Sequence, residues 1–246
     1  MIARAIPPAS SGPGFTRLAL GAAILAAVPV PAAAEVGTVV SAYSDLRYRG
    51  ISLSDGRPVG ILDLSYDASN GLYGALSGSV AATRHEGVKP LGIAVNGGYA
   101  KRIGRRLSGD IGIVHSRYSH YSGVASGRTY TEIYAGLSSK FVGTRLSLSP
   151  NYVGNAGWTL HGEINGHVDL TPSLYLDGEL GALVPLGRYG THASSRGVWD
   201  ARVGLAQRVG RVSLHAAFSA RGKGADVYGP PRHRRVALIV GVSSAL

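Results

Sequence analysis

Short and long connections alternate along this chain, and this alternation constrains the fold more than any other feature. Six longer loops are expected, and polar stretches such as 187–197 and 222–235 are two of them. The five short turns between them are expected at 69–71, 104–106, 142–143, 171–172 and 210–211. In an outer-membrane up-and-down barrel, the periplasmic turns are short and the outer loops are long. The pattern therefore predicts an all-β, antiparallel transmembrane β-barrel.

The spacing of apolar residues supports strands rather than helices. Between residues 158 and 170, Trp158, Leu160 and Ile164 share one face, whereas His161 and Glu163 share the other. A helix would mix these two sets, but a strand separates them because its side chains alternate. This segment is therefore expected to be a strand with an apolar face and a polar face.

The same alternation, in places weaker, predicts about twelve strands in total. The others are expected at 36–43, 59–67, 72–82, 91–100, 107–116, 130–139, 144–152, 174–184, 199–207, 212–221 and 236–243. An even number places both termini on the periplasmic side, as in single-chain bacterial barrels. A soluble β-sandwich also alternates, but its connections need not alternate in length. The barrel is therefore the favoured fold.

The first residues are expected to be an export signal. Arg4 and Arg17 precede an apolar run over 18–30, and alanines at 32–34 offer a cleavage site. This is typical of a secretory signal peptide. The alternative, a membrane anchor, is disfavoured because the run has about 13 residues and a span needs about 20. We expect a signal peptide at 1–34 and the barrel at 35–246, without disulfides since the chain has no cysteine.

The chain is basic, with a formal net charge of +11. Its Lys and Arg residues crowd at predicted turns and loops, such as 101–106 and 232–235, where a membrane interface tolerates them. No nucleic-acid motif accompanies them. The expected partners are therefore outer-membrane lipid and lipopolysaccharide, with no nucleic acid, and the expected location is the bacterial outer membrane of a Gram-negative cell.

Polar faces would line the lumen if the apolar faces meet lipid. The strand residues expected there are Asp63, Asp110, Glu132, Arg145, His161, Glu163, Asp177, Glu179, Asp200 and Arg202. Acidic side chains outnumber arginines in this set, so an open lumen would weakly prefer cations. In a tight lumen the same charges would pair and fill the interior. A barrel of about twelve strands lies between filled and open barrels, so the strand number leaves both outcomes open.

Three segments carry a family resemblance. Residues 44–52 (Ser-Asp-Leu-Arg-Tyr-Arg-Gly-Ile-Ser), 70–79 and 130–137 resemble the signatures "SDYxFRGIS", "SGFYAGxxxS" and "YxELYAGL" of the TorF family. That family consists of outer-membrane barrels whose transport function is unproven. The resemblance covers the mature chain in order and implies a porin without naming a solute. The chain departs from the pattern at Leu46 and Leu72, and it ends in Leu246 rather than an aromatic residue.

Arg47 and Arg49 stand at the outer end of the first predicted hairpin, inside the first of these signatures. One hypothesis is that they line the mouth of the pore and handle anions. The other is that one of them pairs with an inward acid such as Asp63 and fixes the hairpin. The structural role is favoured.

The sequence offers little for catalysis or for binding a metal or cofactor. His115 and Ser116 alternate to opposite faces of one strand, and no G-x-S-x-G motif exists. His161 and His167 are six residues apart on one strand, about 20 Å, so one metal cannot bridge them. We expect no enzyme activity, no metal and no cofactor. The leading hypothesis is passive diffusion of small polar solutes or ions, and the alternatives are a lipid-modifying hydrolase or a closed structural barrel that binds a surface partner.

Overall fold

The computed structural model describes residues 34–83, 85–123, 129–152, 157–186, 197–223 and 235–246. The predicted signal peptide lies outside these residues except for Ala34, which begins the first strand. The predicted start of the mature chain therefore stays a prediction. The described residues contain no helix with the length and hydropathy of a membrane span.

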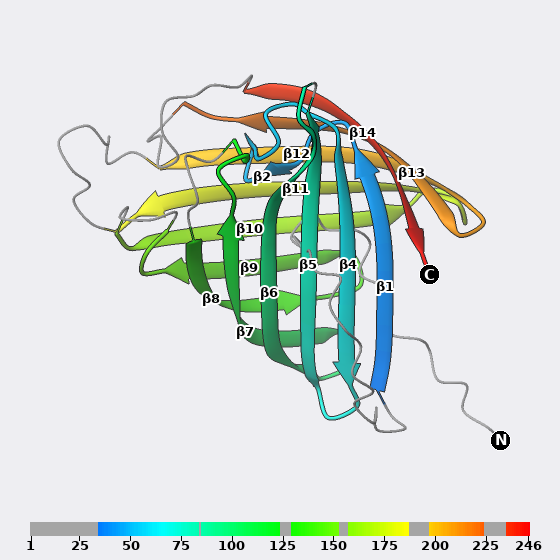
Figure 1. Ribbon diagram of the computed structural model, residues 1–246. Coiled ribbons are helices and arrows are strands. Elements are labelled where there is room, and N and C mark those ends of the chain that lie inside the picture. The colour runs from blue at the N-terminus through cyan, green and yellow to red at the C-terminus, as the bar shows by residue number, and fades with distance from the viewer. Residues whose placement is uncertain (1–33, 84, 124–128, 153–156, 187–196, 224–234) are drawn as a thin grey trace.

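Twelve antiparallel strands of the described residues close into a barrel and confirm the predicted fold class. Figure 1 shows the curved wall that they form. Each strand pairs with its neighbours along the chain, and β14 pairs with β1 to close the ring. A closed barrel leaves no sheet edge, and its strands tilt against the barrel axis. The wall strands are β1 (Ala34–Tyr43), β4 (Val59–Ala68), β5 (Leu72–Thr83), β6 (Gly87–Ile103), β7 (Leu107–Tyr118), β8 (Thr129–Ser138), β9 (Val142–Ser149), β10 (Thr159–Asp169), β11 (Leu174–Pro185), β12 (Val198–Val209), β13 (Val212–Arg221) and β14 (Val236–Ala245).

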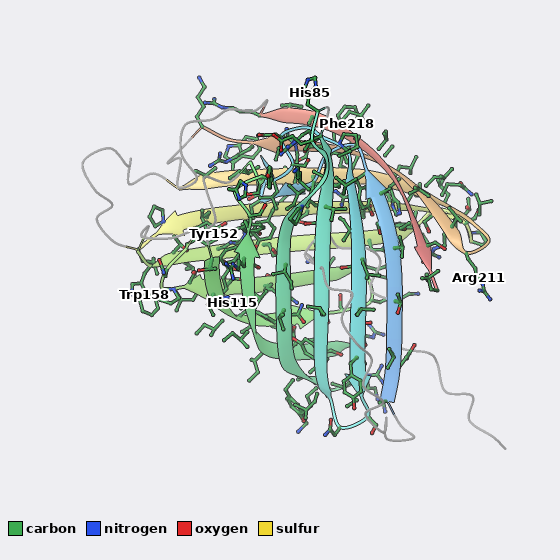
Figure 2. The ribbon with its side chains drawn as sticks, in the orientation of Figure 1. His85, His115, Tyr152, Trp158, Arg211 and Phe218 are labelled. Carbon is green, nitrogen blue, oxygen red and sulfur yellow. The ribbon has the colours of Figure 1, made fainter. Side chains whose placement is uncertain are left out.

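The outer surface of the wall is an apolar belt, as the alternation predicted. Ile164, Leu180 and Phe218 are each more than half exposed on this surface, and Phe218 is labelled in Figure 2. A soluble protein rarely exposes so large an apolar surface. We call the end of the barrel with the short turns the inner end and the opposite end the outer end. Figure 2 shows Arg211 at an inner turn and Trp158 at the outer rim.

Two predicted connections differ from the structure. The expected turn at 142–143 is wrong, because β9 already begins at Val142 and the turn lies at 139–141. There the N–H of Ser139 donates to the carbonyl of Val142 over 2.8 Å, so Val142 is already paired. The loop between β5 and β6, expected to be long, has only three residues because β6 begins at Gly87, earlier than predicted. The pairing of Thr83 with Gly87 extends this hairpin outward.

Two further strands lie inside the ring and were not predicted. β2 (Arg47–Tyr48) and β3 (Ile51–Ser52) form a small hairpin in the connection between β1 and β4, and Figure 1 shows β2 within the barrel. We call residues 44–58 the inward segment. Its residues 45–49 and 51–54 are all buried. The connection expected to be an outer loop therefore folds into the lumen.

The inward segment divides the lumen into two halves. Near the outer end, inward-facing wall residues such as Val59, Tyr118 and Thr159 are buried. Toward the inner end, residues on the same faces, such as Asp67 and Asp169, are exposed. The outer half of the lumen is therefore packed, and the inner half is accessible to water.

Candidate functional site: the narrowed lumen

A tight turn forms the tip of the inward segment. Arg49 and Gly50, between β2 and β3, both have positive φ angles of 50° and 71°. Two central residues with positive φ are typical of a two-residue hairpin turn of type I′, which suits glycine and strains arginine. At Gly50, a side chain would also meet the Cβ of Arg221 at 2.8 Å, so the turn contacts β13. The Arg-Gly pair of the signature at 44–52 therefore positions the tip against the wall.

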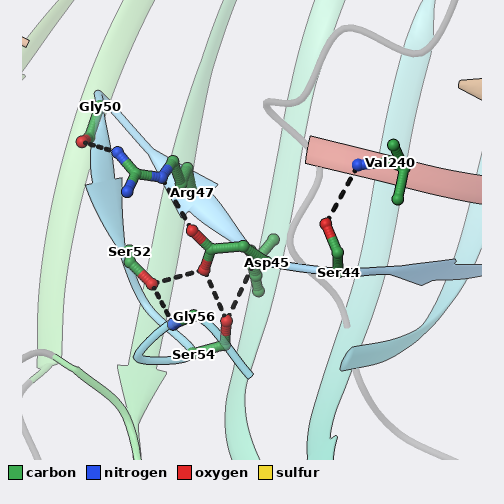
Figure 3. A network of polar contacts seen from close by, with 9 residues as sticks. Ser44, Asp45, Arg47, Gly50, Ser52, Ser54, Gly56 and Val240 are labelled. Carbon is green, nitrogen blue, oxygen red and sulfur yellow. Dashed lines mark hydrogen bonds and ion pairs between the residues drawn. The ribbon is translucent and has the colours of Figure 1, made fainter. Parts of the chain in front are cut away.

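One carboxylate organises the base of the inward segment. Asp45 accepts hydrogen bonds from the hydroxyls of Ser52 (2.5 Å) and Ser54 (2.8 Å) and from Nε of Arg47 (2.8 Å), as Figure 3 shows. Asp45 and Arg47 are both buried, with exposed fractions of 6% and 8%. A buried carboxylate is stable only when its oxygens are paired in this way. The acidic, basic and hydroxyl residues of the signature thus hold the segment in its folded shape.

Arg49 ties the tip of the inward segment to the barrel wall. Its guanidinium donates two hydrogen bonds to the carboxylate of Glu132 on β8, at 2.7 and 3.0 Å. It also lies over the rings of Tyr48 and Tyr152, with its central carbon 4.7 and 5.3 Å from the ring centroids. Both charges are buried, and Glu132 is only 2% exposed. This bidentate pair is the strongest kind of polar contact available between two side chains.

Apolar side chains of the inward segment complete its packing. Leu46, Ile51 and Leu53 are buried in one cluster with tyrosines of the wall, including Tyr118 and Tyr130. The hydroxyls of Tyr118 and Tyr130 lie 3.4 Å apart, so the aromatic wall carries polar groups as well. The inward segment is therefore held by an apolar core and by ion pairs together.

Below the inward segment, the lumen contains further paired charges. Arg145 contacts Asp110 at 3.4 Å and lies over the ring of Tyr134. Arg202 pairs closely with Asp177 on the neighbouring strand. These residues are only partly buried, so they face the accessible half of the lumen. Their pairing leaves little net charge at these two positions.

A second set of acids surrounds a small cavity at the tip of the inward segment. The cavity has a volume of about 20 Å³, room for about one water molecule. Glu163, Glu179 and Asp200 line it together with the arginines at 47, 49 and 202. Glu163 and Asp200 also lie 3.7 and 3.5 Å from the ring nitrogens of the buried His161. Three carboxylates and three arginines therefore border this small cavity.

The strand pairing places the predicted lumen residues on one face of the wall, and both arginines of the inward segment have acidic partners. The ten strand residues expected to face inward do so, and Arg47 and Arg49 join them through the inward segment. An inward acid such as Asp63 was expected to pair with one of the two arginines, and in the structure Arg49 pairs with the inward acid Glu132 and Arg47 with Asp45. Asp63 accepts a hydrogen bond from Ser77 at 2.5 Å. Whether any of these residues lines a conducting path stays a prediction.

Sequence reasoning missed the inward segment, although a signal for it exists. Inward positions near the outer end carry small side chains such as Ser79, Ala81, Ser116, Ser147 and Ser149. Small residues on the inward face of several strands leave space that something else must fill, because protein interiors are close-packed. Together with the buried-type residues of the signature at 44–52, they could have predicted a segment folded into the lumen.

The residues considered for metal binding or catalysis lie apart in the described part of the chain. Within the described ranges, no group of three His, Cys, Asp or Glu side chains could hold a metal ion. His115 lies on the outer surface and contacts the hydroxyl of Thr131 at 2.8 Å, whereas Ser116 is buried on the other face. His115 and Ser116, the pair considered for a hydrolase, therefore lie on opposite faces of the barrel wall, as the alternation predicted.

The barrel resembles solved porin structures. The NanC porin superposes with a TM-score of 0.54 and 12% sequence identity, covering 85% of this chain and 100% of that chain. The KdgM porin gives a TM-score of 0.50 and 14% identity, covering 85% of this chain and 98% of that chain. Identities this low show a shared fold and leave the solute open.

Sequence comparison gives a family without a known activity. No curated protein matches the chain. A family model does match residues 26–215, which is well over half of the sequence and includes the inward segment with Glu132, Asp177 and Arg202. The chain therefore belongs to the family described as "Bacterial protein of unknown function (Gcw_chp)".

Proposed function

We propose that this protein is an outer-membrane channel through which small polar solutes or ions diffuse passively. The inward segment sets the width of the path, and no covalent step is involved. Transport through such a barrel depends on the side chains that line the lumen and on the constriction among them. The proposal agrees with the resemblance to the TorF family. In this proposal, outer-membrane lipid and lipopolysaccharide surround the apolar belt.

The observation that carries this proposal is the contrast between the two faces of the wall. The outward face is apolar, whereas the inward face carries ionisable side chains whose exposure rises toward the inner end. A closed barrel that served only as a scaffold would need a partner for every inward charge, since removing charges from water is costly. Charges that line a water-filled path keep their hydration and can select what passes.

The test is conductance of the purified protein in a planar bilayer. The proposal expects discrete steps of current for the wild-type barrel, with higher conductance when the inward segment is released. A barrel that conducts in neither state would favour the closed structural alternative. Hydrolysis of outer-membrane phospholipid by the same preparation would favour the enzyme alternative.

The channel should prefer cations weakly. The three arginines that line the small cavity pair with Asp45, Glu132 and Asp177, none of which lines it. Glu163, Glu179 and Asp200 therefore dominate the charge at this cavity. Loop charges outside count less, since salt screens them beyond about 8–10 Å.

The reversal potential in a gradient of potassium chloride measures this preference. The double substitution Glu163→Gln and Glu179→Gln should lower the preference for cations, because it removes charge and keeps the size of both side chains. The matched control is Asp67→Asn, since Asp67 lies at the exposed inner end. A clear preference for anions in the wild type would instead assign selectivity to Arg47 and Arg49.

The mature protein is expected to begin at Glu35. The basic and apolar leader with alanines at 32–34 motivates this cleavage site. N-terminal sequencing of the protein recovered from the outer-membrane fraction gives the answer. Recovery of a chain that still begins at Met1 would contradict both the cleavage and the export route.

A further inference from the structure

The wall of the barrel is incomplete at one place near its outer end. Pairing between β1 and β14 runs from Tyr43 and Gly241 to Val39 and Ala245, and the N–H of Ser44 donates one further hydrogen bond to the carbonyl of Val240 over 2.8 Å. Residues 236–239 are paired with β13 and have no strand beside them on the β1 side. Beyond Tyr43 the chain leaves the wall and becomes the inward segment. Figure 3 shows where the pairing ends, at a hydrogen bond of 3.0 Å from the N–H of Val240 to the hydroxyl of Ser44.

A groove of about 530 Å³ lies on the outer surface at this gap. Its floor is formed at outward positions by Ala42, Gly60 and Ala82, where the rest of the belt carries mainly Leu, Ile and Val. A side chain built at Gly60 would meet only Val80, at 3.5 Å. The groove therefore exists because small residues leave volume at the point where a strand is missing.

The lining of the groove is suited to hydrocarbon. Among its lining residues, only Tyr43 and Ser44 carry polar side-chain atoms, and the hydroxyl of Ser44 is engaged with Val240. A site with so few polar partners cannot hold ordered water well. Its volume lies within the range of about 300–1,000 Å³ that is typical of ligand sites.

The groove is continuous with the lipid-facing belt. Val242 belongs to the groove and is 38% exposed, and Val40, the next outward residue of β1, is 44% exposed. Hydrocarbon that covers the belt therefore reaches the groove without crossing a polar barrier. In an empty groove, the lining residues would lack van der Waals contacts that a flexible hydrocarbon chain can supply.

We propose that this groove binds one acyl chain of an outer-leaflet membrane lipid. The inference rests on the proposed outer-membrane location, because the outer end of the barrel then lies in the outer leaflet. Two exposed basic side chains, His85 and Arg235, stand at the outer ends of strands that border the groove, and basic side chains of this kind attract a lipid phosphate. Figure 2 shows His85 projecting at this rim. The bound lipid would cover the place where the inward segment leaves the wall.

Native mass spectrometry tests this binding on the intact mature barrel. The protein is reconstituted with lipid A, the acylated and phosphorylated anchor of lipopolysaccharide, exchanged into mild detergent and measured for retained lipid. The wild type should retain one lipid, and Ala82→Phe, which fills the groove, should lose it. The matched control is Ala182→Phe, because Ala182 is also an exposed alanine, on β11 and away from the groove. Faster migration on gels before boiling verifies that each variant is a folded barrel.

The possible outcomes separate this inference from the channel proposal. Retention by the wild type and by Ala182→Phe, with loss in Ala82→Phe, supports the lipid site. Equal retention in all three proteins, or none in the wild type, overturns it. Retention of palmitic acid but not of lipid A would overturn the choice of a membrane lipid. A barrel that retains lipid but conducts no ions would contradict the channel proposal and support the lipid site. A barrel that conducts ions but retains no lipid would support the channel and contradict the lipid site.

Discussion

Replacing Glu132 with alanine should destabilise the packed outer half of the lumen and raise the conductance of the barrel. The substitution leaves the guanidinium of Arg49 buried without its carboxylate. Removing one partner of a buried ion pair costs about 3–5 kcal/mol. The inward segment should then leave the lumen more often, since its tip depends on this contact. The free energy of unfolding in urea and the single-channel conductance measure the two effects.

A double variant separates loss of the ion pair from loss of packing. Arg49→Leu combined with Glu132→Leu removes both charges and keeps apolar volume, so most of the lost stability should return. Its conductance should also lie closer to the wild-type value than that of Glu132→Ala. If Glu132→Ala alone leaves stability and conductance unchanged, the ion pair does not hold the inward segment.

Placing a charge on the apolar belt should have the second large effect. Ile164 lies in the middle of β10 and is 57% exposed on the outer surface. An arginine at the bilayer midplane of a barrel costs about 2–4 kcal/mol. Ile164→Arg should therefore unfold at lower urea concentration in lipid vesicles and yield less folded protein.

The next residue along the same strand is the control. Asn165 faces the lumen at the accessible inner half, where an arginine stays hydrated, so Asn165→Arg should cost little. Comparable losses of stability in both variants would mean that the assignment of the two faces to lipid and lumen is wrong.

The wall was predictable from the sequence because its signal is local. Each strand repeats apolar and polar residues with a period of two, and four of the five short turns carry glycine, asparagine or proline. Errors arose where a hydrogen bond extends a strand beyond its pattern. The N–H of Ser139 pairs with Val142 where a turn was expected, and Thr83 with Gly87 where a long loop was expected.

The narrowed lumen was less predictable because its contacts join distant parts of the chain. Arg49 forms an ion pair with Glu132 on β8, which is far away in sequence. Asp63, which is nearer in sequence, stands opposite Val39 of β1 in the strand register. Asp63 therefore lies four residues below Tyr43, the point where the chain turns inward. The period of two predicts which face of the wall a residue occupies. It does not predict how far along the barrel axis the inward segment contacts that face.

A reversible staple between the inward segment and the wall tests the central claim most directly. The chain has no cysteine, so Gly50→Cys combined with Arg221→Cys introduces one possible disulfide. A side chain built at Gly50 lies 2.8 Å from the Cβ of Arg221, so a small shift brings the pair to the separation of about 3.5–4.5 Å that a disulfide needs. If the inward segment sets the width of the path, conductance in a planar bilayer should be low when the pair is oxidised and should rise on reduction, whereas each single cysteine variant should not respond. Equal conductance of the oxidised and reduced double variant would contradict the account.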